Sequence, residues 1–475
     1  MRDVQVVELD NGSGVAGALW RQAGAQGSEL RDVEAAGRGE PAPAERRHQG
    51  SARMARLRPL IPCGGRVGPA VVFLYSHDTF GLGHLRRNLA IAERLLEAGQ
   101  FSVHLLTGSP VIAQWRLPPG LHVHPLPPVV KTGAETYAAR EAGHSFGLVK
   151  GYRAALILTL ALRYRPDIFL VDHAPAGMNG EILPTLAMMR RDLPNTRVML
   201  GLRDILDSPD TVRATWTEQE IRPLLEQAYD DILVYGSRKL FDVVDAYGIS
   251  GEAAARVRYC GHVVAADLLR PDAEGGTPCW SAARAAGRKV VLVTAGGGGD
   301  GFALMEAYLR GLSRMAPGAC HSVIVTGPLM SADQRAALTA AAAGREDVDL
   351  VDYITDPLPS LRAADLVIAM AGYNTSAELI AARKRAILVP RPAPRAEQLL
   401  RAHLLARLGL VRAIEQGPDL ADRLAREIPA ALAAPPPSPV TWAQLDLNGA
   451  ERVAAHLATA IEVRSAASGL AGEFA

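Results

Sequence analysis

A histidine at the entry of a predicted helix is the first group in this chain that could do chemistry. Residues 70–76 (AVVFLYS) have the apolar pattern of a buried strand, and residues 77–84 (HDTFGLGH) connect that strand to a predicted helix over 84–98. A neutral imidazole at such a position can accept a proton near neutral pH. His84 is therefore a candidate general base, although a capping or packing role for this histidine stays open.

The loop before His84 contains further polar and small residues. Gly81 and Gly83 bracket a tight turn, while His77 and Asp78 are rival candidates for the base. Asp78 is also placed to orient His84, as carboxylates commonly do for catalytic histidines. We expect His77, Gly81 and Gly83 to face an acceptor substrate.

A second set of candidate residues lies at the start of a predicted helix in the later half of the chain. Residues 366–371 predict a buried strand, and the small and polar residues after it predict a helix start. These are Gly372, Asn374, Thr375 and Ser376. Free N–H groups at a helix N-terminus favour a diphosphate. Glu378 could accept hydrogen bonds from ribose hydroxyls, and Glu397 and Gln398 from a hexose; an ordinary packing unit with capped helices is the alternative.

A run of four glycines precedes another predicted helix. Gly296, Gly297, Gly298 and Gly299 follow a strand pattern at 289–295. Successive glycines cost backbone entropy, so the run indicates that the main chain must approach something closely. A flexible loop beside a hinge is the alternative interpretation.

Polar residues also end two predicted strands of the first half. Asp172 and His173 follow the strand at 167–171, and Arg203 follows the strand at 197–202. Open α/β sheets bind ligands beyond the carboxyl ends of their strands. These three residues are candidate acceptor-side residues, with satisfied strand-end turns as the alternative.

From residue 70 onward, predicted strands and helices alternate, which is typical of α/β proteins with doubly wound parallel sheets. We expect two Rossmann-like domains that face a cleft. The predicted divisions are a disordered leader at 1–65, an N-terminal acceptor domain at 66–268, a linker at 269–287, a C-terminal nucleotide-sugar donor domain at 288–434, a connector and crossing helix at 435–463, and a tail at 464–475.

These patterns together resemble the GT-B glycosyltransferases, in particular the MurG-type and diacylglycerol glycosyltransferases with a family 28 C-terminal type domain. The resemblance lies in the small-residue helix start with Glu378, the Ile-Leu-Val-Pro strand at 387–390, the Glu397-Gln398 pair, and the first loop, which keeps Asp78, Thr79, Gly81, Gly83 and His84. Phe80 and Leu82 depart from the small residues usual in that loop, which suggests an apolar contact with the acceptor or the facing domain.

The resemblance implies an inverting, metal-independent transfer of a hexose or N-acetylhexosamine. The donor would be a nucleotide-diphosphate sugar, with uridine as the expected base, and the acceptor an unidentified hydroxyl compound. It also implies that the run Gly296–Gly299 contacts donor phosphate and that no cofactor is needed. A degenerate GT-B binding or scaffold protein and a nucleotide-sugar 2-epimerase are the alternatives.

Other classes are disfavoured by composition and spacing. The chain has 475 residues with a net charge of +1, so no nucleic-acid partner is indicated. Arg86 occupies the place of the third glycine in a dinucleotide-binding fingerprint, which argues against a nicotinamide cofactor. The pair Asp347 and Asp349 has the pattern of a solvated turn, and we expect no metal.

We expect a cytoplasmic protein without a transmembrane span, because the longest compact apolar run, 154–162, is about half of the ~20 residues needed. The leader lacks the apolar segment of a signal peptide, and Met54 is a candidate start. A peripheral membrane contact stays open, and its candidate patch is Phe80, Leu82, Arg86, Arg87, Trp115 and Arg116.

Overall fold

A computed structural model describes residues 68–77, 83–115, 117–131, 137–140, 143–269, 283, 286–354 and 357–472. The predicted leader, Asp78 and Gly81 lie outside the described residues, as do most of the predicted linker and the patch residues Phe80, Leu82 and Arg116.

The first half of the chain forms a parallel sheet around its first strand. The described strands lie in the order β3-β2-β1-β6-β7-β8-β9. Their bounds are β1 Ala70–Tyr75, β2 Phe101–Thr107, β3 His122–Pro125, β6 Ile168–Asp172, β7 Arg197–Arg203, β8 Asp231–Tyr235 and β9 Val257–Tyr259. A short antiparallel pair, β4 (Val129–Lys131) and β5 (Tyr137–Ala139), lies apart from it.

Helices cover both faces of this sheet because its central strands are apolar on both sides. Phe73 and Tyr75 of β1 pack toward one helix layer, whereas Val72 and Leu74 pack toward the other. The first layer contains α3 (Phe146–Tyr164), α4 (Leu183–Asp192), α5 (Pro209–Glu218), α6 (Ile221–Ala228) and α7 (Val243–Tyr247). The second contains α2 (Gly83–Glu97) and α18 (Gly449–Gly472). Short helices η2 (Pro110–Gln114), η3 (Met178–Gly180), α8 (Gly251–Ala255) and α9 (Ala266–Leu269) complete this half.

The second half repeats the same topology. Its sheet has the order β12-β11-β10-β13-β14-β15, again around its first strand. The bounds are β10 Val290–Thr294, β11 His321–Val325, β12 Val348–Val351, β13 Leu366–Ala369, β14 Ala386–Leu388 and β15 Arg412–Ala413. The helices are α11 (Phe302–Leu312), α12 (Ala332–Ala342), α13 (Pro357–Ala363), α14 (Tyr373–Ala381), α15 (Glu397–Arg407), α16 (Leu420–Ala433) and α17 (Pro439–Trp442).

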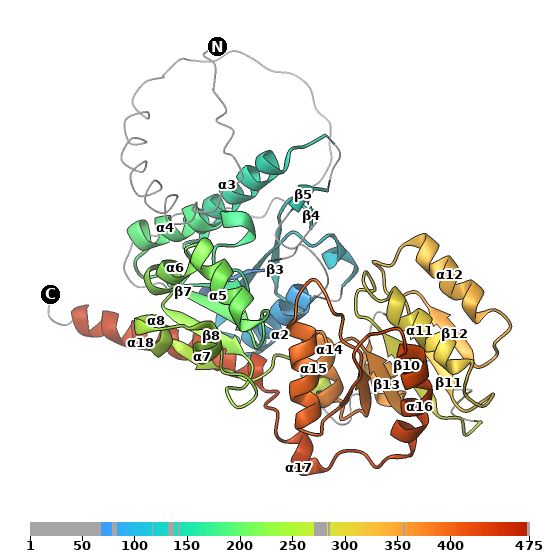
Figure 1. Cartoon of the computed structure of the whole chain (residues 1–475). Helices are drawn as coiled ribbons and strands as arrows, with labels where there is room; N and C mark the ends of the chain where they lie inside the picture. Colours follow the sequence, from blue (N-terminus) through green and yellow to red (C-terminus); the bar gives the residue numbers. More distant parts are fainter. Residues whose placement is uncertain are drawn as a thin grey trace.

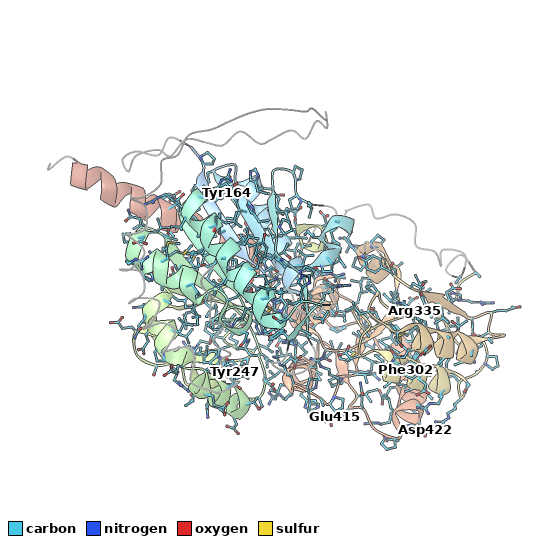
Figure 2. The ribbon with its side chains drawn as sticks, turned by 90° about the horizontal axis from the view of Figure 1, so that it is seen from above. Tyr164, Tyr247, Phe302, Arg335, Glu415 and Asp422 are labelled. Carbon is cyan, nitrogen blue, oxygen red and sulfur yellow. The ribbon has the colours of Figure 1, made fainter. Side chains whose placement is uncertain are left out.

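The two sheets lie in separate halves of the molecule, with α14 and α15 of the second half turned toward α2 of the first (Figure 1). The view from above in Figure 2 also separates Tyr164 in the first half from Phe302 and Arg335 in the second. In both sheets the strand order reverses beside the first strand, where doubly wound sheets bind their ligands. The prediction of two Rossmann-like halves is confirmed.

Two chain segments cross between the halves side by side. His262 N–H donates to the Asp446 carbonyl at 2.7 Å, and Gly449 N–H donates to the His262 carbonyl at 3.0 Å. A Cβ on Gly449 would lie 2.5 Å from the Gly261 carbonyl oxygen, so this crossing requires glycine. Beyond it, Val453 and Leu457 of α18 join the core next to α2.

Several predicted boundaries were wrong. The residue pattern over 135–164 predicts one helix, but α3 begins only at Phe146, because residues 137–139 pair with β4. The pattern over 217–229 also predicts one helix, whereas the structure has the two helices α5 and α6, separated by Glu220 in the left-handed region at φ 51°. The predicted tail at 464–475 is helical as far as Gly472, since its Ala, Ser and Leu residues can continue α18.

Candidate active site

The candidate site in the first half lies where three adjacent strands end. His77 follows β1, Asp172 ends β6 and Arg203 ends β7, and these strands are neighbours in the sheet. Helix α2 begins beside them and carries His84 in its first turn. The parallel sheet therefore brings four of the predicted site residues together at one edge.

His84 is paired with a buried carboxylate. Its Nδ1 lies 2.6 Å from Asp172 Oδ2, and the Asp172 side chain has no exposed surface. Arg87, one turn after His84, donates from Nη2 to the same carboxylate at 3.0 Å. Burial alone would raise the pKa of Asp172, but Arg87 and His84 hold it at about 2. Asp172 is therefore ionised. Arg87 Nη2 also lies 3.0 Å from His84 Nδ1, but the shorter 2.6 Å contact to the carboxylate, which can only accept, makes Nδ1 the donor.

The same burial keeps His84 neutral. Desolvation lowers the pKa of His84 to about 4, and it outweighs the upward effect of Asp172. An imidazole whose Nδ1–H donates to Asp172 leaves Nε2 as a proton acceptor. A proton taken up at Nε2 would be stabilised by the adjacent carboxylate. In this geometry His84 Nε2 can accept a proton while Asp172 orients the ring.

Two further histidines surround His84. Its ring centroid is 5.1 Å from that of His173 and 5.7 Å from that of His77. His173 has φ 71°, in the left-handed region that few residues other than glycine adopt, and its N–H donates to the Gly201 carbonyl at 2.7 Å. Burial lowers the pKa of His173 as well. His84 and His173 are therefore uncharged at neutral pH.

Arg203 supplies a positive charge beside these rings. Its Nε is buried and has no hydrogen-bond partner among the described residues. Burial, and after it the charge of Arg87, lowers the pKa of Arg203 to about 10, so the guanidinium stays protonated at neutral pH. An anionic group of a substrate would satisfy this donor.

The glycine run of the second half packs tightly against its own sheet. Gly298 has φ 86°, and a Cβ there would lie 1.9 Å from the Thr326 carbonyl oxygen. The close approach expected from the glycines is thus made to the backbone after β11. Gly296 and Gly299 are exposed, and Gly296 faces Thr375 of α14, whose Oγ1 would be 3.9 Å from a Cβ on that glycine. The loop and the start of α14 therefore adjoin one another.

The start of α14 touches the first half directly. Gly372 is the N-cap residue, with no side-chain cap. Asn374 Nδ2 donates to the Gly83 carbonyl at 3.1 Å, across the gap between the halves. Asn374 Oδ1 and Ser376 Oγ are buried without a hydrogen-bond partner in the described part of the chain. Unsatisfied polar atoms at a helix N-terminus are typical of a site that receives a polar ligand.

Glu378, predicted to bind ribose, is paired with Arg86 of α2. Arg86 Nη1 lies 2.9 Å from Oε1 and 3.2 Å from Oε2 of this carboxylate. The side chains are 25% and 14% exposed, so the pair lies at the rim of the contact between the halves. The guanidinium also lies over the Trp115 ring, 5.5 Å from its centroid.

Glu397 and Gln398 begin α15 and are both buried. Arg391 donates from Nη2 to Glu397 Oε1 at 2.8 Å and from Nη1 to Asp300 Oδ2 at 2.8 Å. Gln398 Oε1 accepts from the Arg391 backbone N–H at 3.3 Å. Glu397 Oε2 has no hydrogen-bond partner among the described residues, so one oxygen of this predicted sugar-binding group is available.

A buried ion pair fixes α15 to the first half. Arg401 donates to both oxygens of Asp204, at 2.7 and 3.1 Å, and to the Ala371 carbonyl at 2.9 Å. Tyr373 lies between the halves, where its hydroxyl accepts from the Val263 N–H at 2.9 Å and its ring stacks on His262. The first and second halves therefore meet through specific polar contacts.

Several of these residues were not foreseen in these roles. Arg86 and Arg87 were predicted as part of a membrane patch, but Arg87 is buried against Asp172 and Arg86 binds Glu378, so this patch was wrong for both. Asp172 was predicted to contact an acceptor, whereas it is fully buried against His84 and Arg87. His84, Arg86 and Arg87 lie within one turn of α2, and this spacing was the sequence signal that could have placed both arginines near the candidate site.

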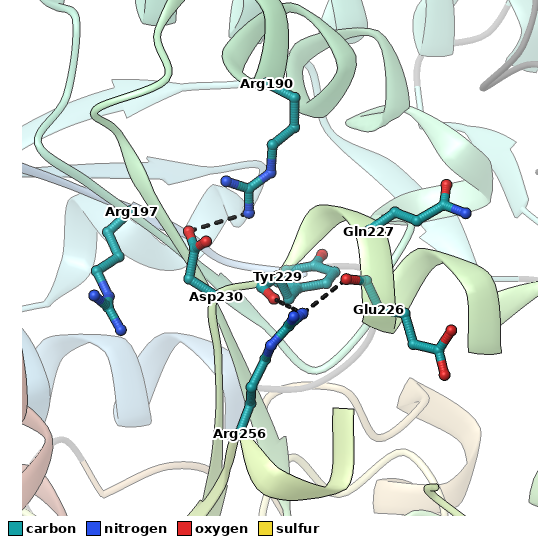
Figure 3. Close-up of a pocket in the computed structure, with 7 residues that line it drawn as sticks. All are labelled: Arg190, Arg197, Glu226, Gln227, Tyr229, Asp230 and Arg256. Carbon is teal, nitrogen blue, oxygen red and sulfur yellow. Dashed lines mark hydrogen bonds and ion pairs between the residues drawn. The ribbon is translucent and has the colours of Figure 1, made fainter. Parts of the chain in front are cut away.

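A polar pocket elsewhere has a different character (Figure 3). It is lined by Arg190, Arg197, Glu226, Gln227, Tyr229, Asp230 and Arg256. Arg197 begins β7 and Asp230 precedes β8, so the pocket lies at the amino ends of the strands, away from His84. Arg190 pairs with Asp230 at 3.1 Å, and Arg256 donates to the Glu226 carbonyl at 2.7 Å. These polar groups largely satisfy one another.

Two further observations concern metal ligands and long apolar helices. Among the described residues, no group of three or more His, Cys, Asp or Glu side chains is placed to hold a metal ion. No helix in that part of the chain combines the length and apolar character that crossing a bilayer requires. Cys260 and Cys320 are buried free thiols.

Comparison with known structures defines the fold class. The chain aligns with the crystal structure of MurG from Acinetobacter baumannii at a TM-score of 0.51 and 15% identity, covering 82% of this chain and 99% of that one. It aligns with a UDP-glucosyltransferase from Polygonum tinctorium at 0.56 and 14%, covering 84% and 100%. The two facing Rossmann-like halves are thus a GT-B fold, as predicted.

The sequence comparisons match the second half of the chain to a family model. Residues 290–440 match the glycosyltransferase family 28 C-terminal domain. A Burkholderia vietnamiensis protein is 30% identical over 236 residues; it is named UDP-N-acetylglucosamine--N-acetylmuramyl-(pentapeptide) pyrophosphoryl-undecaprenol N-acetylglucosamine transferase. That match covers 49% of this chain and 62% of the relative, so the chain spans less than two thirds of its length.

Proposed function

We propose that this protein is a glycosyltransferase that moves a hexose or N-acetylhexosamine from a nucleoside-diphosphate sugar, with UDP as the carrier, to an acceptor hydroxyl. The observation that carries the proposal is the His84–Asp172 pair, 2.6 Å apart, beside the α14 helix start across the gap. A base on one half and an anion-favouring helix start on the other are the two parts that the reaction needs.

The proposed reaction is a single displacement without a metal. His84 Nε2 takes the proton of the acceptor hydroxyl while that oxygen bonds to the anomeric carbon. The bond between the anomeric carbon and the diphosphate oxygen breaks, and the electron pair leaves with the diphosphate. N–H groups at the start of α14 and of the exposed Gly296 and Gly299 would stabilise the negative charge of the leaving diphosphate. Because the acceptor oxygen attacks from the side opposite the diphosphate, the configuration of the anomeric carbon is inverted.

In the donor part of the site, Glu378 would accept hydrogen bonds from ribose hydroxyls. Glu397 Oε2 and the amide of Gln398 would face the sugar. Arg203, His77 and His173 would line the acceptor side next to His84. Asp172 is a positioning residue in this scheme, because it acts through His84.

A lipid-carried acceptor, reached from the cytoplasmic side by peripheral contact, is the acceptor class that helix α3 favours. Its exposed face presents Leu148, Tyr152 and Leu162, which are 63%, 63% and 45% exposed. The helix contains no acidic residue, and it carries Lys150 and Arg163. Phe146 at its start stacks on Tyr137, which contacts the His77 ring, so the beginning of this helix lies near the candidate site.

The donor proposal is tested by thermal unfolding with UDP, GDP, dTDP, ADP and their sugars. A ligand at ~100 times its dissociation constant should stabilise the protein by about 2.7 kcal/mol. We expect a uridine compound to do so, and Glu378→Ala to lose the effect. No stabilisation by any nucleotide would overturn the transferase proposal and favour a binding or scaffold protein.

The base is tested by transfer assays with His84→Ala. We expect intact donor binding and a rate lower by about 10²–10⁴-fold, with His122→Ala, an exposed histidine on β3, as the matched control. Conversion of UDP-N-acetylglucosamine to its 2-epimer without any acceptor would instead identify an epimerase.

The membrane contact is tested by sedimentation with phosphatidylcholine vesicles that contain or lack phosphatidylglycerol. Leu148→Asp with Leu162→Asp should abolish binding to the anionic vesicles, whereas Val440→Asp, at another exposed apolar residue, should not. Equal binding by all three proteins would exclude α3 as the contact.

A further inference from the structure

We propose that Arg86 is a donor-binding residue that exchanges partners when the nucleotide enters: it leaves Glu378, which then binds the ribose, and turns to the diphosphate. This inference rests on the proposed function and adds a residue of the opposite half to the donor site. Arg86 stands two residues after His84 on α2, and Glu378 is 292 residues further along the chain.

Arg86 and a bound ribose would compete for the Glu378 carboxylate. Arg86 Nη1 contacts both oxygens of Glu378, at 2.9 and 3.2 Å. Two ribose hydroxyls need these same oxygens as acceptors. One guanidinium nitrogen contacts both oxygens, so ribose hydroxyls compete with the ion pair for this carboxylate.

The guanidinium released from Glu378 has a proposed anion site close by, at the start of α14. The first turns of α2 and α14 touch, because Asn374 Nδ2 donates to the Gly83 carbonyl at 3.1 Å. Arg86 is rooted in that turn of α2, and the start of α14 is the proposed diphosphate site. A guanidinium binds phosphate oxygens with the same paired geometry that it uses for a carboxylate.

The ion pair between Arg86 and Glu378 is accessible to a ligand from solvent. The pair is partly hydrated, with 25% and 14% of the two side chains exposed, so a ligand can displace it without opening a dry interface. The Trp115 ring lies 5.5 Å from the guanidinium in this structure, so Arg86 has an attractive contact besides Glu378. By contrast, Arg87 is buried on Asp172 and has no such freedom.

The exchange predicts a signature in ligand affinity. A nucleoside must break the ion pair and gives Arg86 no new partner, whereas a nucleoside diphosphate supplies one. In Arg86→Gln, therefore, Glu378 is freed and uridine should bind at least fivefold more tightly than to the unmodified protein. The advantage of UDP over uridine should fall at least tenfold, because the diphosphate has lost its arginine.

Calorimetric titration of the full chain with UDP and with uridine tests the exchange of partners by Arg86. Where uridine binds weakly, its dissociation constant is measured by competition with UDP. Arg94→Gln is the control, because Arg94 lies on the same helix and pairs with Glu97 at 2.6 Å, away from α14. It should change neither constant.

Each outcome decides the inference. Loss of affinity for both ligands by one factor in Arg86→Gln would show a merely structural role and overturn the exchange while the proposed function stands. Absence of UDP binding to the unmodified protein would overturn the proposed function, and the exchange with it. Opposite shifts for uridine and for the diphosphate increment would establish the exchange.

Discussion

Among the described residues, two ion pairs join the halves of this molecule, and they differ in their access to water. Arg401 and Asp204 are 2% and 1% exposed, with two bonds between them and a third from Arg401 to the Ala371 carbonyl. Arg86 and Glu378 are 25% and 14% exposed and share one guanidinium nitrogen. The first pair is part of the packed joint, and the second lies at the rim, where a ligand can reach it.

This difference separates structural from exchangeable charge. A buried charge that loses its partner cannot be hydrated, so breaking such a pair costs several kcal/mol. A partly exposed pair recovers most of its energy from water when it opens. We therefore expect the joint at Arg401 to hold the halves together and the pair at Arg86 to respond to the donor.

The largest effect is expected at the buried pair. Arg401→Met should lower the free energy of unfolding by about 3–5 kcal/mol, because it removes the charged partner of the buried Asp204 carboxylate, which keeps only His262 Nε2 at 3.5 Å and the Ile205 N–H at 2.7 Å. Urea denaturation measures this. Adding Asp204→Leu should restore much of the loss, since no charge is then stranded.

The control for that experiment is Arg412→Met, which breaks an exposed pair with Glu427 at 2.7 Å and should cost less than about 1 kcal/mol. An equal cost for Arg401→Met and Arg412→Met would show that the joint is hydrated in solution.

The second effect is the pH dependence contributed by His84. Folding lowers the pKa of His84 from 6.5 to about 4, so between these values the unfolded chain binds a proton that the folded protein does not. Stability therefore falls as the pH drops from 6.5 to 4, by about 3 kcal/mol for this group. His84→Asn should lose correspondingly less stability between pH 7 and pH 4 in urea titrations.

The comparison of unmodified protein with His84→Asn also tests whether the two halves stay in contact in solution. If the halves separate in solution, His84 becomes hydrated and its pKa returns toward 6.5. Unmodified protein and His84→Asn would then lose the same stability on acidification, and the rim pair could not form as described.

The smallest effect is expected at the rim. Arg86→Gln should change the free energy of unfolding by less than about 1 kcal/mol, similar to Arg94→Gln on the same helix. A loss above about 2 kcal/mol for Arg86→Gln alone would mean that this pair is structural, like the one at Arg401, and is not free to exchange.

Much of the fold could be predicted because strand signals here are local. Both sheets have central strands with continuous apolar runs, such as 70–75 and 366–369, and these were found within one or two residues. The hairpin of β4 and β5 was missed because its pairing depends on contacts between segments and has no local signal strong enough to interrupt an apparent helix. The end of α18 was missed because small residues suit both a helix and a tail.

The candidate site was predictable in its location and less so in its pairing. Strand ends and helix starts placed His84, Asp172, Asn374 and Glu378 near a common gap. The sequence could not predict which charged residues form ion pairs, because the partners of Glu378 and Arg401 are 292 and 197 residues away. Asp78, predicted as the group that orients His84, lies outside the described residues, whereas Asp172 makes that contact.

The sequence by itself determined the alternation of strands and helices, the glycine-containing loops after β1 and β10, and the identity of the groups able to move a proton or bind an anion. These depend on apolar periodicity and on residue type, which are local properties. Only the tertiary structure decided which charges are buried and which remain open to exchange. Burial and ion pairing depend on how two distant segments pack, and a low-dielectric joint and a hydrated rim can use the same residue types for opposite purposes.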